Sequence, residues 1–278
     1  MCRLFRISRQ SVYQARHRYE RRAVELLRVK ELVEQQRMKM PRLGTRKLYF
    51  LLKPELVRQG VKIGRDGLFE YLRQEHLLVK PKKNYTKTTD SKHWLRKHPN
   101  LLTDKSCAAE RGVEEVFVSD ITYVKSRERM HYLSLVTDAY SRRIMGYHLS
   151  DDLSAENTMQ ALRMAVKERR TNKTLIHHSD RGLQYAADIY QKELERNKIL
   201  PSMTEGGNCY QNALAERVNG ILKQEFLQAI CNTGSELKRL IRESIEIYNN
   251  QRPHLSLAMR TPAAVHKKAC EECFTGSN

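Results

Sequence analysis

The chain has 278 residues and a formal net charge of +19, which favours acidic or polyanionic partners. No apolar run approaches the roughly 20 residues that span a bilayer. The first ten residues also lack the apolar core of a signal peptide. We therefore expect no membrane partner and a cytoplasmic location.

The positive charge is concentrated in the first 110 residues, which hold 27 Lys and Arg against 11 Asp and Glu. The remaining residues carry a net charge of only +3. A basic segment of this kind is typical of nucleic-acid binding, because neutralised phosphates release their counterions. Charge alone leaves open a ribosome-associated or merely soluble basic protein.

Residues 1–40 have apolar side chains at helical spacing, and Ser8 is placed to cap a helix that starts at Arg9. Arg9 and the polar residues after it suit a recognition helix in a DNA groove. The helix that would precede it in a helix-turn-helix is almost missing, so the motif is either vestigial or completed by another polypeptide. An ordinary amphipathic helix is the alternative.

Residues 41–83 predict a second helix-turn-helix. Its parts are a helix at 44–56, a turn at 60–67 and a helix at 68–77. Arg65 and Arg73 are its candidate DNA contacts, and the basic residues after the second helix suit a wing. Residues 84–112 are polar and basic without periodicity, which indicates a linker that follows DNA phosphates.

From residue 113 onward, strand-like apolar runs are interspersed with amphipathic helical segments. The predicted strands lie at 116–124, 132–138, 144–149, 174–179 and 200–203. The predicted helices lie at 154–169, 187–197, 211–229 and 235–249. Three strands, a helix, a strand and further helices form the ribonuclease-H-like order, an α/β class. We assign residues 113–250 to this core and residues 251–278 to a C-terminal tail.

The six cysteines are expected to be reduced in a cytosolic protein. Cys270 and Cys273 form a CxxC pair, and His266 lies nearby in the sequence. A structural zinc site usually has four ligands in two such pairs. The sequence therefore favours an incidental cysteine pair in a frayed tail over a metal site.

Three acids occupy positions suited to a metal cluster. Asp120 lies within a largely apolar strand, where Asp is disfavoured. Asp180 lies just past the end of another strand, and Glu216 lies in the first turns of a helix. Mg²⁺ prefers carboxylate oxygens, and two such ions about 3.5–4 Å apart serve phosphodiester cleavage. Together these acids are the candidate catalytic and metal-binding residues.

Thirty-five residues separate Asp180 from Glu216. The local sequence motifs are VSDITYV around Asp120, HHSDRGLQY around Asp180 and NALAERVNGILKQEF around Glu216. This pattern resembles the bacterial DDE transposases of the insertion-sequence-three family, which are related to retroviral integrases. Lys223, seven residues after Glu216, stands where that family carries a basic residue, on the same helical face. Asn212, one turn before Glu216, is a further candidate on this face. The resemblance covers nearly the whole chain.

The resemblance implies a ribonuclease-H-like core with a mixed five-stranded sheet, preceded by a small helical DNA-binding region. It implies a polynucleotidyl transferase that frees a 3′-hydroxyl at a transposon end and joins it to other DNA. Two Mg²⁺ ions, for which Mn²⁺ substitutes, are the expected cofactors. The implied partners are terminal inverted repeats, target DNA, further copies of the chain and an upstream reading-frame product. When bound to DNA, the protein is expected to associate with the nucleoid.

Several smaller signals remain. His178 and Arg181 flank Asp180 and are candidate DNA contacts, although a buried histidine is the favoured reading of His178. Asp138 is interpreted as a turn residue. Gln211 and Phe117 depart from the family's usual Asp and Trp without touching the acids.

Two functions compete with an active transposase. One is a catalytically silent, transposon-derived DNA-binding protein or repressor, against which the intact acids argue. The other is a ribonuclease H, which the basic N-terminal region disfavours because that region suits reading of a DNA major groove.

Overall fold

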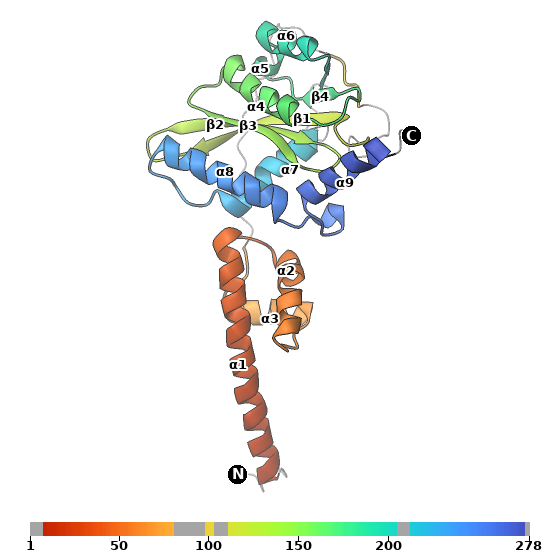
Figure 1. The fold of residues 1–278 in the computed structure, drawn as a ribbon. Helices are drawn as coiled ribbons and strands as arrows, with labels where there is room; N and C mark the ends of the chain where they lie inside the picture. Colours follow the sequence, from red (N-terminus) through yellow and green to blue (C-terminus); the bar gives the residue numbers. More distant parts are fainter. Residues whose placement is uncertain (1–7, 81–97, 103–110, 205–211, 276–278) are drawn as a thin grey trace. The chain divides into compact units, whose positions relative to one another are not determined.

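A computed structural model of the chain describes residues 8–80, 98–102, 111–204 and 212–275. The chain divides into two compact units, residues 1–81 and 82–278 (Figure 1). The regions 1–40 and 41–83 that the sequence separated therefore belong almost entirely to one unit. Most of the predicted linker at 84–112 lies outside the described residues.

The first unit consists of three helices, α1 Arg9–Lys39, α2 Thr45–Arg58 and α3 Arg65–Gln74. Ser8 caps α1 as predicted, because its hydroxyl accepts a hydrogen bond of 3.1 Å from the amide of Ser11. The helices bury apolar side chains that form the core of this unit: Val29, Val33, Leu48, Leu52, Leu56, Leu68 and Leu72. Helix α3 starts three residues before the predicted position, because the extended Gly64 precedes its first turn.

The second unit contains a mixed five-stranded sheet in the order β3-β2-β1-β4-β5, as the resemblance implied. Its strands are β1 Val116–Lys125, β2 Met130–Asp138, β3 Ile144–Ser150, β4 Ile176–Ser179 and β5 Leu200–Met203. The first three strands form an antiparallel meander, and β4 and β5 run parallel to β1. Strand β1 therefore occupies the centre of the sheet.

Helices cover both faces of this sheet (Figure 1). One face carries α4 Ala155–Glu168, α5 Leu183–Ala186 and α6 Asp188–Arg196, and the other α7 Ala213–Ile221, α8 Gly234–Asn250 and α9 Pro262–Thr275. Phe117, Leu162 and Tyr190 belong to the apolar core on the α4 side. Val118 and Ala215 belong to the core on the α7 side.

Gly146 of β3 allows α4 to approach the sheet closely. A Cβ atom at this position would overlap the carbonyl oxygen of Ala161 and lie 2.7 Å from the amide nitrogen of Ala165. Neither atom can move without disturbing the helix backbone. The packing of α4 on the sheet therefore requires glycine here.

The long helix predicted at 211–229 is shorter and irregular. Helix α7 ends at Ile221 and continues as a π-helix, η2 Leu222–Phe226. A bidentate ion pair stabilises the π-helix. The buried Arg252 donates hydrogen bonds of 2.8 and 2.6 Å to the two carboxylate oxygens of Glu225 in this helix. Arg252 therefore anchors the π-helix to the segment that follows α8.

The prediction of a frayed tail at 251–278 is wrong for its described part. A 3-10 helix, η3 Leu255–Leu257, leads to α9, which begins at Pro262, where the missing amide costs no helix hydrogen bond. Ala269 and Cys270 of α9 pack against Val113 beside β1. In the part of the chain that the structure describes, no helix is both long and apolar enough to cross a membrane.

Candidate active site

The parallel pairing of β1 and β4 brings the first two acids together. Val118 of β1 pairs with His178 of β4. Two residues farther along lie Asp120, still within β1, and Asp180, the first residue after β4. Side chains two residues apart share a face, and Val118 belongs to the apolar cluster of Ala215 on α7. Asp120 accordingly lies on the face of the sheet that α7 covers, and Asp180 is close enough for its charge to raise the pKa of Asp120.

Helix α7 carries the third acid to the same face. Glu216 follows the buried Ala215 in the first turn of α7. One turn later, Nδ2 of Asn219 donates a hydrogen bond of 2.7 Å to Oδ2 of Asp120. This bond connects the helix that carries Glu216 to the strand that carries Asp120.

Backbone amides hold the two aspartates in place. Oδ1 of Asp120 accepts a hydrogen bond of 2.9 Å from the amide of Ile121. Oδ1 of Asp180 accepts one of 3.0 Å from the amide of Gly182. A Cβ atom at Gly182 would lie 3.1 Å from this same oxygen. One oxygen of each carboxylate is therefore oriented by a backbone amide, that of Asp120 within β1 and that of Asp180 in the turn after β4.

The three carboxylates repel one another. Burial and the negative charge of Asp180 raise the pKa of Asp120 to about 7, against the opposing hydrogen bond from Asn219. Glu216 is exposed, yet desolvation of its carboxyl and the charge of Asp180 raise its pKa as well. A bound cation would relieve this repulsion and favour the ionised acids.

Buried polar atoms beside the acids fit a divalent ion and its water. The Tyr185 hydroxyl and Oδ1 of Asn219 have no hydrogen-bond partner among the described residues. Burial raises the pKa of Tyr185, and the charges of Tyr190 and then Asp180 add to this effect. Carboxylates supplemented by neutral oxygens are the donors that Mg²⁺ prefers.

Lys223 lies beside the acids, as its spacing predicted. Its Nζ donates a hydrogen bond of 3.1 Å to Oγ1 of Thr122, which is two residues beyond Asp120 on β1. Desolvation lowers the pKa of Lys223, and the negative charge of Asp120 opposes this shift. A cation in this position suits the binding of a DNA phosphate.

Two predicted DNA contacts lie in the interior instead. His178 is fully buried, and its Nδ1 forms a hydrogen bond of 2.9 Å with Oγ of Ser202 on β5. Asn212 is also buried, and its Nδ2 donates to the carbonyl oxygen of Ser119 at 3.1 Å. The favoured interpretation of His178 as a buried histidine is thus confirmed, whereas the DNA contact predicted for Asn212 is wrong, because the start of α7 turns its side chain inward.

The other candidate contacts are accessible or partly so. Arg9, Arg65 and Arg73 are exposed on the helices of the first unit, and Arg181 is half-buried after β4. Arg65 pairs with Asp66 at 2.8 Å, and the guanidinium of Arg73 lies 5.1 Å from the centre of the Phe69 ring. Their contact with DNA stays a prediction. Gln211 lies outside the described residues.

Asp138 is the last residue of β2, and its side chain holds the turn that follows, consistent with the structural role interpreted from the sequence. Its carboxylate accepts hydrogen bonds from the amide of Ser141 at 2.9 Å and from the amide of Glu114 at 3.0 Å. It also accepts one from the Ser141 hydroxyl at 2.5 Å. These bonds occupy the carboxylate in local structure, away from the three acids.

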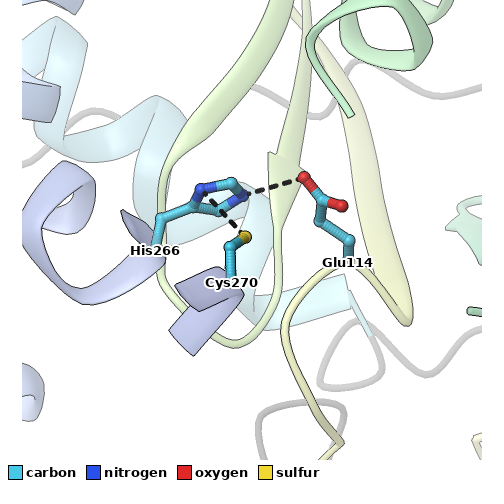
Figure 2. A group of neighbouring side chains, drawn as sticks. All are labelled: Glu114, His266 and Cys270. Atoms are coloured by element: carbon cyan, nitrogen blue, oxygen red, sulfur yellow. Dashed lines mark hydrogen bonds and ion pairs between the residues drawn. The ribbon is translucent and has the colours of Figure 1, made fainter. Parts of the chain in front are cut away.

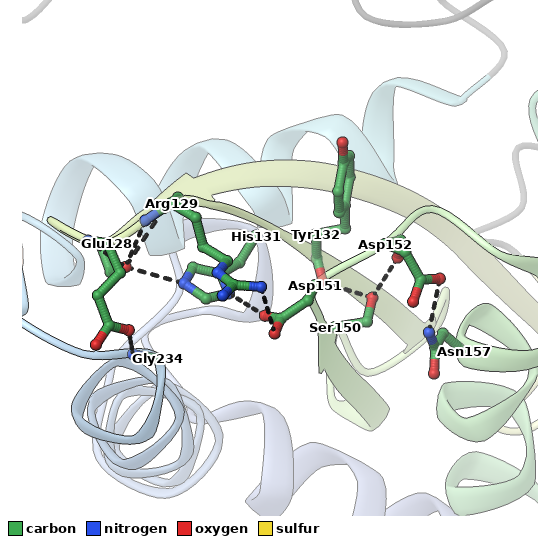
Figure 3. Close-up of polar contacts among 10 residues, drawn as sticks. Glu128, Arg129, His131, Tyr132, Ser150, Asp151, Asp152, Asn157 and Gly234 are labelled. Atoms are coloured by element: carbon green, nitrogen blue, oxygen red, sulfur yellow. Dashed lines mark hydrogen bonds and ion pairs between the residues drawn. The ribbon is translucent and has the colours of Figure 1, made fainter.

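A Ser-His-Asp chain near the β1–β2 turn has a structural role. His131 forms hydrogen bonds of 2.7 Å with Asp151 and 3.0 Å with Oγ of Ser126 (Figure 3). Ser126 is fully buried, and its oxygen accepts bonds from the turn amides, so it is inaccessible as a nucleophile. In the same region, Glu128 accepts a bond of 3.1 Å from the amide of Gly234 at the start of α8 (Figure 3).

Sequence reasoning missed Asn219, Thr122 and Tyr185 as neighbours of the acids. Asn219 could have been found from its position one turn after Glu216. Thr122 could have been found from its position two residues after Asp120 on a strand. The sequence spacing of Tyr185 does not predict its position near the acids, because that position depends on how the turn after Asp180 folds.

The chain is similar in sequence to known proteins. Two models of the integrase core domain match residues 110–209 and 197–262. An uncharacterised 31 kDa protein of insertion element IS600 from Shigella sonnei is 37% identical over 96% of this chain and 98% of its own length. Transposase InsF of insertion sequence IS3A from Escherichia coli strain K12 is 32% identical, over 73% of this chain and 70% of its own length. The HTLV-2 integrase catalytic core, solved with magnesium, is 19% identical and covers 56% of this chain and 99% of its own, with a TM-score of 0.46.

The sheet order and the matching family models define a ribonuclease-H-like integrase core, and hence a polynucleotidyl transferase. Such a core depends on divalent metal. The chain belongs to the DDE transposases of the IS3 family. Its activity is transposition and the integration of DNA.

Proposed function

We propose that this transposase cleaves the DNA at a transposon end and joins the freed 3′-hydroxyl to target DNA, with Asp120, Asp180 and Glu216 as ligands of two Mg²⁺ ions. The observation that carries the proposal is the parallel pairing of β1 with β4, because β1 contains Asp120 and β4 ends one residue before Asp180. Mn²⁺ satisfies the same oxygen ligands and substitutes for Mg²⁺.

The protein's part in this reaction is positioning and charge stabilisation. When bound, the two ions supply activation of the attacking oxygen and stabilisation of the leaving oxygen. Asn219 keeps the carboxylate of Asp120 oriented, and the Gly182 amide does the same for Asp180. Lys223 binds a phosphate of the DNA next to the acids. No covalent protein–DNA intermediate is required.

We assign recognition of the terminal inverted repeats to the first unit. Arg65 and Arg73 of α3 and Arg9 of α1 are exposed cations in a strongly basic part of the chain. Arg181 of the second unit contacts DNA near the acids. Because two transposon ends must be held together during joining, the active species is a homo-oligomer.

The test is a strand-transfer assay with labelled transposon ends and Mg²⁺ or Mn²⁺. We expect Asp120→Ala, Asp180→Ala and Glu216→Ala to abolish both cleavage and joining while binding to the ends is retained. The matched control is Asp188→Asn, which changes an exposed acid at the start of α6 and should leave both steps intact. Wild-type product from any of the three alanine variants would disprove the site.

The same assay separates the competing function. A wild-type chain that binds the ends but yields no cleaved or joined product in either metal would be a silent DNA-binding protein. The full-length variant Arg65→Gln/Arg73→Gln tests the first unit, and it should weaken end binding and lower its dependence on salt. Unchanged binding would remove α3 from the DNA interface.

A further inference from the structure

The π-helix η2 carries two charged residues with different partners. Nζ of Lys223 donates a hydrogen bond of 3.1 Å to Oγ1 of Thr122 on β1. Two residues later, the carboxylate of Glu225 accepts two hydrogen bonds from Arg252, which follows α8. Residues two positions apart on a helix do not face each other. The π-helix therefore connects the strand of Asp120 on one side to the chain after α8 on the other.

The wide turn of η2 is a local departure from the α-helix that precedes it. The amide of Leu227 donates a hydrogen bond of 2.9 Å to the carbonyl oxygen of Leu222, five residues earlier. The side-chain amide of Gln228 donates to the carbonyl oxygen of Lys223, also five residues earlier. Such π-turns are rare, and they occur frequently at functional sites. We therefore expect a contact outside the helix to favour this form over a continuing α-helix.

Arg252 makes such a contact from a buried position, since its side chain is only 2% exposed. Its Nε and Nη2 donate hydrogen bonds of 2.8 and 2.6 Å to the two carboxylate oxygens of Glu225. Its Nη1 lies 3.0 Å from Nε2 of His254, which is the acceptor because a guanidinium only donates. The guanidinium carbon also lies 5.9 Å from the centre of the Tyr248 ring. The bidentate geometry fixes the direction as well as the distance of Glu225.

The sheet holds the chain around Arg252 on both sides. Before it, the side chain of Asn249 bonds to the amide and the carbonyl oxygen of Ile144 on β3, at 2.9 and 3.0 Å. After it, α9 packs beside the start of β1, where Nε2 of His266 lies 3.2 Å from Oε1 of Glu114 (Figure 2). Arg252 is therefore a fixed support for the π-helix.

We propose that Arg252 and Glu225 are positioning residues for Lys223. Their ion pair holds Leu222–Phe226 in the π-form, so that the Lys223 ammonium stays beside the acids and binds a DNA phosphate there. This role rests on the proposed function, in which Lys223 contacts the phosphate. Arg252 is too deeply buried to touch DNA itself, so its effect on DNA binding passes through Lys223.

Binding of the full-length protein to transposon ends over a range of salt concentrations tests this role. Lys223→Gln should lower the slope of log affinity against log salt concentration by about one. Arg252→Lys keeps the charge but lacks the planar fork, and we expect the same fall in slope. Combining the two changes should cause no further fall, because both remove the same phosphate contact. The control is Glu193→Gln, which breaks an ion pair of 2.9 Å with Arg163 on the other face of the sheet and should keep the wild-type slope.

A second variant separates positioning from stability. Removing half of a buried ion pair is costly, whereas replacing both partners by apolar side chains is often tolerated. Glu225→Leu/Arg252→Met makes that replacement. Its melting temperature should stay close to that of the wild type, yet the slope of its salt dependence should match that of Lys223→Gln.

The possible outcomes separate this role from the proposed function. A wild-type slope in Arg252→Lys or in Glu225→Leu/Arg252→Met would overturn the positioning role. So would a further fall in slope when Arg252→Lys is added to Lys223→Gln. Both results would leave the phosphate contact of Lys223 standing. An unchanged slope in Lys223→Gln itself would instead disprove that contact, and the positioning role with it.

Discussion

The side-chain amide of Asn219 on α7 donates a hydrogen bond of 2.7 Å to the carboxylate of Asp120 on the central strand β1. The other Asp120 oxygen accepts from the chain's own backbone at Ile121. Each oxygen of this carboxylate therefore accepts one oriented hydrogen bond. The contact couples the position of α7, and thus of Glu216, to Asp120.

Replacing Asn219 by alanine should slow strand transfer by about 10–100-fold, the usual cost of losing a partner of a metal ligand. The Mg²⁺ concentration needed for half-maximal activity should rise, because Asp120 is no longer held in place. Asn250→Ala, which changes an exposed amide on α8, is the control. An unaltered metal dependence in Asn219→Ala would show that the hydrogen bond has no role in metal binding.

Lys223→Gln should reduce binding and joining of transposon ends, because a cation beside the acids is lost. The slope of log affinity against log salt concentration should fall by about one, as for the loss of one phosphate contact. Lys167→Gln, an exposed change on α4 across the sheet, should leave the slope unchanged. Loss of activity without a change in slope would assign Lys223 to site structure through Thr122 instead.

Gly146→Ala should destabilise the second unit by about 1–3 kcal/mol or more, because the added methyl group overlaps the backbone of α4. Gly220→Ala on α7 is a matched glycine replacement, since its Cβ would meet no atom within 4 Å. That variant should gain up to about 1 kcal/mol from helix propensity. Urea unfolding of both variants measures the difference, and equal stabilities would contradict the close approach of β3 and α4.

His177 should make the stability pH-dependent. Burial, and then the neighbouring His178, lower the pKa of His177 to about 3. Its Nε2 lies within hydrogen-bond distance of Oγ of Ser119 at 2.8 Å and of the Tyr190 hydroxyl at 2.9 Å. The folded state thus favours the neutral ring, so this contribution is complete above pH 6.5 and is lost as the pH falls toward 3.

We therefore expect the unfolding free energy of the wild type to fall more steeply than that of His177→Gln between pH 6 and pH 4. The difference in slope should approach about 1.4 kcal/mol per pH unit, the value for one proton. His17→Gln, which changes an exposed histidine on α1, should retain the wild-type slope. Parallel curves for wild type and His177→Gln would show that the ring is protonated in the folded state.

Much of the fold was predictable because it depends on local pattern. The strand around Asp120, the cap at Ser8 and the helix of Glu216 follow from residue spacing and capping chemistry. The predictions that were wrong concern features that depend on tertiary contacts. The inward turn of Asn212 depends on a carbonyl group 93 residues away in β1, and the end of α7 at Ile221 precedes a π-helix that Arg252 anchors from the tail.

The pairing of Val118 with His178 also limits how this transposase can change over time. Substitutions along β1 alter one side chain each, but an added or deleted residue between Val116 and Asp120 would turn Asp120 to the opposite face of the sheet. All three acids would still be present in such a gene, but the proposed metal site would lose Asp120. Descendants of this insertion element can therefore be sorted by strand length as well as by the presence of the acids.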